Sequence, residues 1–203
     1  MNKILIFYTS IGLGHKVMAE NIGYHLSNAG CNARLEDISK VQEGKFSKIT
    51  IGVHQYINKH LPFVWSWLYK SSLVNFLTLP LRVPLASFNY RQAKRIIDEF
   101  KPELIICVQT TASAVVAYLK RKKLYNNLFA IGFSDFHLHR YWLYEEADFY
   151  LANIQEQKEE MARLGINPNK IFVCSMNARP KLAIDKISVK NKLNAPLEKK
   201  VIL

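Results

Sequence analysis

Short apolar runs alternate with longer stretches of mixed polarity along this chain. The run Lys3–Tyr8 (KILIFY) is almost uniformly apolar, which is typical of a parallel strand buried on both faces. The pattern then predicts a helix from about His15 to Asn28, ended by Gly30, and a second strand over Asn32–Ile38. The chain therefore opens with a strand, a loop, a helix and another strand.

More strands and helices alternate in the second half. The apolar run PELIICV precedes the helix-like TTASAVVAYLK, and NLFAIGF precedes a polar loop. ADFYLA precedes the helix-like IQEQKEEMARLG, and KIFVC comes last. This alternation predicts an α/β fold with a doubly wound, Rossmann-like parallel sheet. Ligands of such sheets bind beyond the carboxyl ends of the strands, where the loops discussed below are expected.

The segment Leu61–Leu85 interrupts this alternation. Three prolines and two cations divide it, so it lacks the ~20 consecutive apolar residues of a transmembrane helix. Its mixture of aromatic, aliphatic and basic side chains suits a membrane interface, although an insertion packed against the core has the same composition. The expected membrane contacts are Trp65, Trp67, Tyr69, Lys70, Phe76 and Arg82.

The charge of the chain favours the membrane interpretation. Its 203 residues hold 28 Lys and Arg against 16 Asp and Glu, a net charge of +12. Such an excess indicates an anionic partner, namely nucleic acid, an anionic membrane or a phosphorylated substrate, or simply a solvated basic surface. No nucleic-acid recognition motif accompanies the charge, so nucleic acid is not expected as a partner.

The three cysteines are isolated along the chain. Cys31, Cys107 and Cys174 are odd in number, lie in apolar surroundings and lack metal-ligand spacing. They are predicted to be reduced core residues of a protein in a reducing compartment. The apolar run at the N-terminus has only the length of a strand, so it is not interpreted as a signal peptide.

The loop SIGLGH follows the first predicted strand. Gly12 and Gly14 fill two positions of the dinucleotide motif G-x-G-x-x-G, but Val17 stands at the third. Glu36 and Asp37 lie at a suitable distance for a ribose, so a nicotinamide-dependent oxidoreductase stays as an alternative. Valine in place of the third glycine argues against the close-packed turn that this alternative needs.

His15 is expected at the start of the first helix. Backbone N–H groups and the helix dipole favour negative charge there and disfavour imidazolium. A neutral imidazole beside an anion site can act as a general base toward a hydroxyl group. The alternative is a histidine that only caps the helix or packs against it.

A second polar cluster, FSDFHLHRYW, directly follows a predicted buried strand. Its two histidines and its aspartate could suggest a metal ion, but no further ligand cluster completes such a site, and no metal is expected. A carboxylate that orients or assists a base, beside aromatic and basic groups for a lipid headgroup, explains the composition better. The residues concerned are Asp135, His137, His139, Arg140 and Trp142.

Six segments occur in the order of a known family: SIGLGH, PELIICV, SDFHLHRYW, ADFYLAN, LGINPNKIFV and NARPKL. The chain thereby resembles the N-terminal half of the monogalactosyldiacylglycerol synthase and processive diacylglycerol glucosyltransferase group. The resemblance implies a family 28-like glycosyltransferase of the GT-B fold, with two Rossmann-like domains. It implies hexose transfer from a UDP-sugar to diacylglycerol, with inversion, and no other cofactor.

The resemblance also implies roles for individual residues. His15 corresponds to the catalytic base, and Asp135 would orient or assist it. Ser10, Gly12 and Gly14 correspond to the loop that the acceptor and the diphosphate approach. His139, Arg140 and Trp142 would line the acceptor or lipid-headgroup side. The chain departs from the family at Ser134 in place of threonine, at Gln109 and Thr110, and at Ser175 and Asn177.

By this resemblance, residues 1–182 form an acceptor and membrane-binding domain with an insertion at about 58–86. Residues 183–198 are expected to be a linker, and 199–203 the first strand of a nucleotide-sugar domain. The protein is expected at the cytoplasmic face of the cell membrane as a peripheral protein. An alternative from another class is a non-catalytic membrane-binding subunit that works with a separate donor-domain chain.

Overall fold

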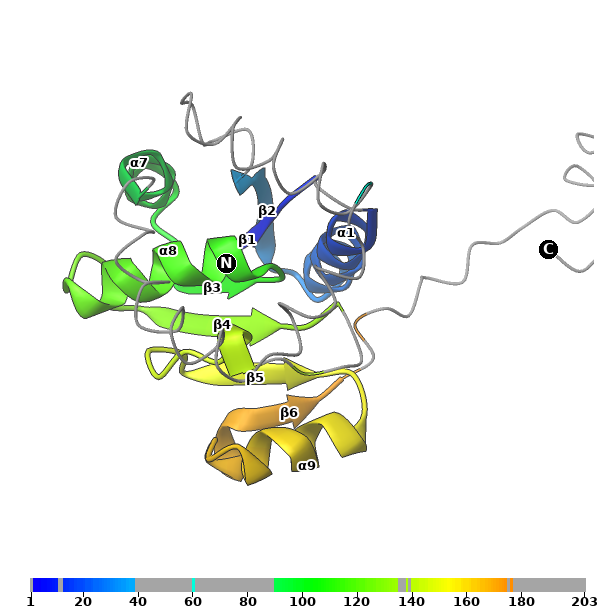
Figure 1. Ribbon diagram of the computed structural model, residues 1–203. Helices are drawn as coiled ribbons and strands as arrows, with labels where there is room; N and C mark the ends of the chain where they lie inside the picture. The colour runs from blue at the N-terminus through cyan, green and yellow to red at the C-terminus, as the bar shows by residue number, and fades with distance from the viewer. Residues whose placement is uncertain are drawn as a thin grey trace, which may run out of the picture.

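In the computed structural model, six parallel strands form one sheet within the described residues, in the order β2-β1-β3-β4-β5-β6. Figure 1 shows these strands side by side, with the arrows of β3 to β6 pointing the same way. The predicted α/β class with a parallel sheet is confirmed. The structure describes residues 2–10, 13–38, 60, 90–134, 138, 140–174 and 176. The strands are β1 (Lys3–Tyr8), β2 (Asn32–Asp37), β3 (Leu104–Cys107), β4 (Leu128–Gly132), β5 (Phe149–Ala152) and β6 (Ile171–Val173).

Four helices accompany the described strands. The first begins two residues before the predicted start, and Gly30 follows it with a φ of 81°. The helix over Tyr90–Phe100 was not expected from the sequence. They are α1 (Leu13–Asn28), α7 (Tyr90–Phe100), α8 (Thr110–Arg121) and α9 (Gln155–Arg163), with short 3-10 turns at Arg140–Trp142 and Pro168–Lys170.

The two faces of the sheet carry separate apolar cores. Ile4 and Ile6 of β1 pack with α1 on one face. Leu5 and Phe7 pack on the other face, in a core that includes buried residues of α7, α8 and α9. These four side chains of β1 are at most 6% exposed, so β1 is buried on both faces as its uniform apolar sequence predicts.

The strand order reverses beside β1. The chain goes from β1 to β2 on one side of it, and β3 pairs on its other side. Since α1 follows β1 on one face and α8 follows β3 on the other, the first turns of these helices diverge at the carboxyl ends of the strands. Such a switch point is where open α/β sheets bind ligands.

Glycine allows α1 to approach the sheet, but not at the third position of the dinucleotide motif. A Cβ on Gly23 would lie 2.7 Å from Leu35 Cδ1, so α1 packs closely against β2 at this residue. Val17, at the motif's third position, is half-buried. The close contact between helix and strand is therefore made at Gly23, six residues after the position where a dinucleotide-binding loop requires it.

The prediction for the cysteines needs correction. All three cysteines are free, but only Cys107 is buried, while Cys31 and Cys174 are half-buried. At the end of α8, Lys120 pairs with Asp148 and its side chain is only 16% exposed, whereas Arg121, Lys122 and Lys123 are exposed.

Some predictions concern residues outside the described part. They include the linker at 183–198, the strand at 199–203, and nearly all of the insertion at about 58–86, with Trp65, Trp67, Tyr69, Lys70, Phe76 and Arg82. Of the helices that the structure does describe, none combines the length and the apolar character needed to span a membrane.

Candidate functional site

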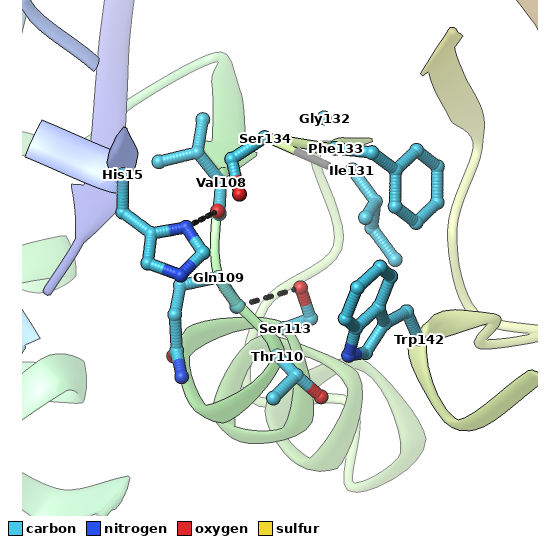
Figure 2. A pocket seen from close by; sticks show the side chains of 10 residues that line it. All are labelled: His15, Val108, Gln109, Thr110, Ser113, Ile131, Gly132, Phe133, Ser134 and Trp142. Carbon is cyan, nitrogen blue, oxygen red and sulfur yellow. Dashed lines mark hydrogen bonds between the residues drawn. The ribbon is translucent and has the colours of Figure 1, made fainter. Parts of the chain in front are cut away.

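A pocket of about 380 Å3, open to solvent, lies at the carboxyl ends of the central strands. His15 comes from the first turn of α1, and the other lining residues come from the ends of β3 and β4, the start of α8 and the 3-10 turn. The lining residues are His15, Val108, Gln109, Thr110, Ser113, Ile131, Gly132, Phe133, Ser134 and Trp142 (Figure 2).

His15 is anchored across the switch point. Its Nδ1 lies 2.8 Å from the carbonyl oxygen of Val108, and the N–H of Val108 in turn donates to the carbonyl of Phe7 at 3.1 Å. A carbonyl can only accept a hydrogen bond, so Nδ1 carries the hydrogen. In the neutral ring the lone pair is then on Nε2, which makes no hydrogen bond to the described part of the chain.

An aromatic wall faces His15 across the pocket. Trp142 is half-buried, and its ring stacks on that of Phe133 with centroids 6.0 Å apart and an interplanar angle of 30°. Figure 2 shows Trp142 and His15 on opposite sides of the α8 turn. The His15 side of the pocket can therefore exchange a proton, while the Trp142 side offers a flat apolar surface.

The first turn of α8 forms the floor of the pocket. Gln109 caps the helix, since its Oε1 accepts hydrogen bonds from the N–H groups of Thr111 at 2.6 Å and Ala112 at 3.2 Å. Ser113 Oγ donates to the carbonyl of Gln109 at 3.0 Å. Apart from His15, the polar groups on the side chains of the ten lining residues are three hydroxyls, one amide and the indole N–H of Trp142, with no carboxylate, lysine or arginine.

The structure brings some of the predicted site residues together. His15 and Trp142 line the same pocket. Gly14 is exposed beside His15 in the first turn of α1, and Arg140 is exposed at the start of the 3-10 turn that carries Trp142. The remaining predictions, Gly12, Asp135, His137 and His139, fall on residues outside the described ranges.

The backbone of Ser10 contacts a carboxylate at the end of β2. Its N–H donates to Asp37 Oδ1 at 3.3 Å, and Asp37 is only 6% exposed. Glu36 accepts a hydrogen bond from Arg34 Nε at 2.7 Å. Both acidic side chains considered for a ribose are thus engaged within the protein, which argues against the nicotinamide alternative.

The floor residues were missed by the sequence analysis. Gln109 and Thr110 were noted only as departures from the family, and Ser113 was not noted. A usable signal was present, because polar residues that directly follow a buried parallel strand and open a helix lie at the ligand-binding edge of the sheet. Among the described residues, no group of three His, Cys, Asp or Glu side chains is placed to hold a metal ion.

Known proteins resemble this chain over parts of their length. It is 25% identical over 120 residues to a processive diacylglycerol beta-glucosyltransferase of Bacillus cytotoxicus, a match that covers 58% of this chain and 30% of that protein. A solved apo structure of the lipopolysaccharide outer core galactosyltransferase WaaB aligns with a TM-score of 0.44 and 16% identity, over 85% of this chain and 45% of that one.

The chain thus spans less than half the length of either relative. A family model described as monogalactosyldiacylglycerol (MGDG) synthase matches residues 15–176, which include both walls of the pocket. This match covers most of the sequence, and the chain belongs to the MGDG synthase family of glycosyltransferases.

Proposed function

We propose that this chain is the acceptor side of a lipid glycosyltransferase that transfers a hexose from a UDP-sugar to diacylglycerol, with inversion. The observation that carries the proposal is the hydrogen bond between His15 Nδ1 and the Val108 carbonyl. It leaves Nε2 as the proton acceptor of the neutral ring, in a pocket at the switch point of the sheet.

The proposed reaction is a single displacement. His15 Nε2 takes the proton of the diacylglycerol hydroxyl while that oxygen forms a bond to the anomeric carbon of the hexose. The bond from this carbon to the diphosphate oxygen breaks, and UDP leaves with the electron pair. Because attack and departure occur on opposite faces of the sugar, the anomeric configuration inverts.

The lining of the pocket supports a neutral alcohol as the acceptor. Hydroxyls and the Gln109 amide can bind the glycerol oxygens, and Trp142 and Phe133 offer apolar surface to the start of the acyl chains. Since Val108 holds Nδ1, we assign Asp135 to assist from the acceptor side. His139 and Arg140 complete the proposed headgroup side.

The remaining parts of the proposal follow the family. A second domain would hold most of the UDP-sugar, either on the same polypeptide or on a separate chain. Ser10, Gly12 and Gly14 would face the diphosphate, and the insertion at about 58–86 would contact the membrane. By the family resemblance, this contact would be a peripheral one at the cytoplasmic face of the cell membrane. The Bacillus cytotoxicus relative is a processive diacylglycerol beta-glucosyltransferase, which supports the choice of acceptor.

The test removes the proposed base but keeps a hydrogen-bond donor to the Val108 carbonyl. In His15→Asn, an amide N–H can still donate to Val108, whereas no ring nitrogen remains to accept a proton. We expect kcat for glycolipid synthesis by the product of the full reading frame to fall about 10²–10⁴-fold, the usual contribution of a general base. His15→Ala should lose at least as much.

The matched control is His25→Asn, at an exposed position in the last turn of the same helix. It should leave kcat unchanged. Rates of hexose transfer from UDP-glucose and UDP-galactose to dioctanoylglycerol would be measured in mixed micelles. Wild-type kcat in His15→Asn would show that His15 is not the base, and no transfer by the wild-type protein would contradict the proposed reaction.

A further inference from the structure

Two tyrosines behind the pocket form a buried clasp. The hydroxyl of Tyr150, on β5, donates to the Tyr144 carbonyl at 2.6 Å and accepts from the Tyr144 N–H at 3.0 Å. Tyr144 is fully buried and Tyr150 is 1% exposed. One side chain thus satisfies both backbone groups of a loop residue in the interior, where an unpaired group is costly.

The clasp lies close to Trp142 along the chain. Only Leu143 separates Trp142 from Tyr144, and the N–H of Leu143 closes the 3-10 turn on the carbonyl of Arg140 at 3.2 Å. Holding the backbone of Tyr144 therefore fixes the end of the turn from which the Trp142 side chain enters the pocket.

The ring of Tyr150 supports the same wall from behind. It stacks on Phe133 with centroids 6.3 Å apart and an interplanar angle of 3°, and Phe133 stacks in turn on Trp142 at 6.0 Å. Tyr150 and Phe133 are buried, so these contacts are confined by the core. The aromatic wall is the end of a three-ring stack that begins at Tyr150.

Tyr144 extends the connection to the floor. Its hydroxyl lies 3.4 Å from the carbonyl oxygen of Thr110 and 3.5 Å from its Oγ1, at the outer limit of a hydrogen bond. Thr110 begins α8 and lines the pocket. The clasp therefore reaches both the wall and the floor of the site.

We propose that Tyr150 is a positioning residue that holds Trp142 against the pocket, through its hydroxyl on Tyr144 and its ring on Phe133. It touches no substrate, since it is buried and does not line the pocket. Its effect on acceptor binding rests on the proposed function, whereas its effect on Trp142 does not.

The test removes the hydroxyl and keeps the ring. Tyr150→Phe is made in a Trp65→Phe/Trp67→Phe background of this chain, whose only tryptophan is then Trp142. Without the clasp, we expect acrylamide to quench Trp142 fluorescence more strongly. Affinity for dioctanoylglycerol, measured by the same fluorescence, should weaken at least about threefold, because the variant loses both buried hydrogen bonds of the clasp.

The matched control is Tyr125→Phe. Tyr125 is 5% exposed and its hydroxyl donates to the Leu128 carbonyl at 2.9 Å, at the amino end of β4, whereas the pocket lies at the carboxyl end of this strand. In the same background it should lower the urea midpoint, though less than Tyr150→Phe because it removes one hydrogen bond and not two, and it should leave the quenching of Trp142 unchanged. This difference separates positioning from a general loss of stability.

Equal quenching in Tyr150→Phe and its Trp65→Phe/Trp67→Phe parent, or an equal rise in both tyrosine variants, would overturn the proposal. Stronger quenching in Tyr150→Phe alone would support it. If that result came with no binding of dioctanoylglycerol by the wild-type protein, the positioning role would stand and the proposed acceptor would be wrong.

Discussion

At the scale of single residues, a backbone carbonyl orients the histidine of the site, a role that a carboxylate often has in other proteins. Val108 fixes the tautomer of His15 without adding charge, and β1 holds Val108 through Phe7. A backbone anchor cannot be recognised from residue types. The sequence therefore predicts the position of His15 after a strand and a glycine loop, but not the partner of its Nδ1.

Trp142 illustrates the same limit. Its place after a buried strand and a polar loop predicted that it belongs to the site, and it lines the pocket. Its supports on Tyr144 and Tyr150 depend on tertiary contacts between a loop and a strand, which no local pattern encodes. Local patterns locate site residues, and packing decides what holds them.

Gly14 allows a direct test of ligand approach at this scale. A Cβ at this position would meet no atom of the described residues within 4 Å, and Gly14 lies in a helix, so Gly14→Ala should raise the free energy of unfolding by about 0.5–1 kcal/mol. If acceptor or diphosphate approaches this backbone, the same variant should lose glycosyl transfer. Urea unfolding and kcat/KM measure the two effects.

Lys16→Ala is the control for that experiment, because Lys16 is exposed in the same helical turn. It should change neither quantity appreciably. Full activity in Gly14→Ala would mean that no ligand approaches the backbone there closely enough to require glycine.

At the scale of elements, α7 shows where the sequence analysis fell short. Its segment YRQAKRIIDEF buries Ala93 and Ile97 four residues apart, with Ile96 and Phe100 half-buried beside them. This is the spacing of an amphipathic helix. It was missed because the helix follows the aromatic segment Leu61–Leu85, which drew the interpretation toward a membrane insertion.

The ends of two helices carry a conformational cost. Lys101 follows α7 with φ at 53°, and Lys123 follows α8 with φ at 57°, a region that glycine adopts without steric penalty. Lys123→Gly should therefore raise the free energy of unfolding by about 0.5–1 kcal/mol. Urea denaturation followed by circular dichroism measures this change.

Lys122→Gly is the matched control, since Lys122 has a φ of −85° and gains nothing from glycine. It should be neutral or destabilising. An equal gain from both substitutions would show that the positive φ of Lys123 is not the source of the effect.

At the scale of the whole molecule, the sequence predicted the strands and the class of the sheet, because parallel buried strands have a strong apolar pattern. It did not predict the strand order, since neighbouring strands are chosen by tertiary packing. The pocket depends on that order, because β1 and β3 must be neighbours for His15 to reach Val108.

The net charge of +12 leads to a prediction about membranes. The chain should bind phosphatidylglycerol vesicles more tightly than phosphatidylcholine vesicles, and salt should weaken that binding. If the proposed insertion makes the contact, Lys70→Glu and Arg82→Glu should each cost about 1 kcal/mol or more, roughly fivefold in affinity. Vesicle co-sedimentation measures the binding.

The control variants are Lys122→Glu and Lys123→Glu, at two exposed residues beyond the end of α8. These changes should weaken binding less. Equal losses at both places would indicate a general electrostatic attraction, without a contact by the insertion.

The place of β1 between β2 and β3 has a consequence for synthesis on the ribosome. Ile4 pairs with Leu104, so β1 keeps one edge unpaired until β3 has left the exit tunnel. During that interval a very apolar strand is available to pair with other nascent chains. We therefore expect chaperone dependence to be greatest for nascent chains that stop before Cys107.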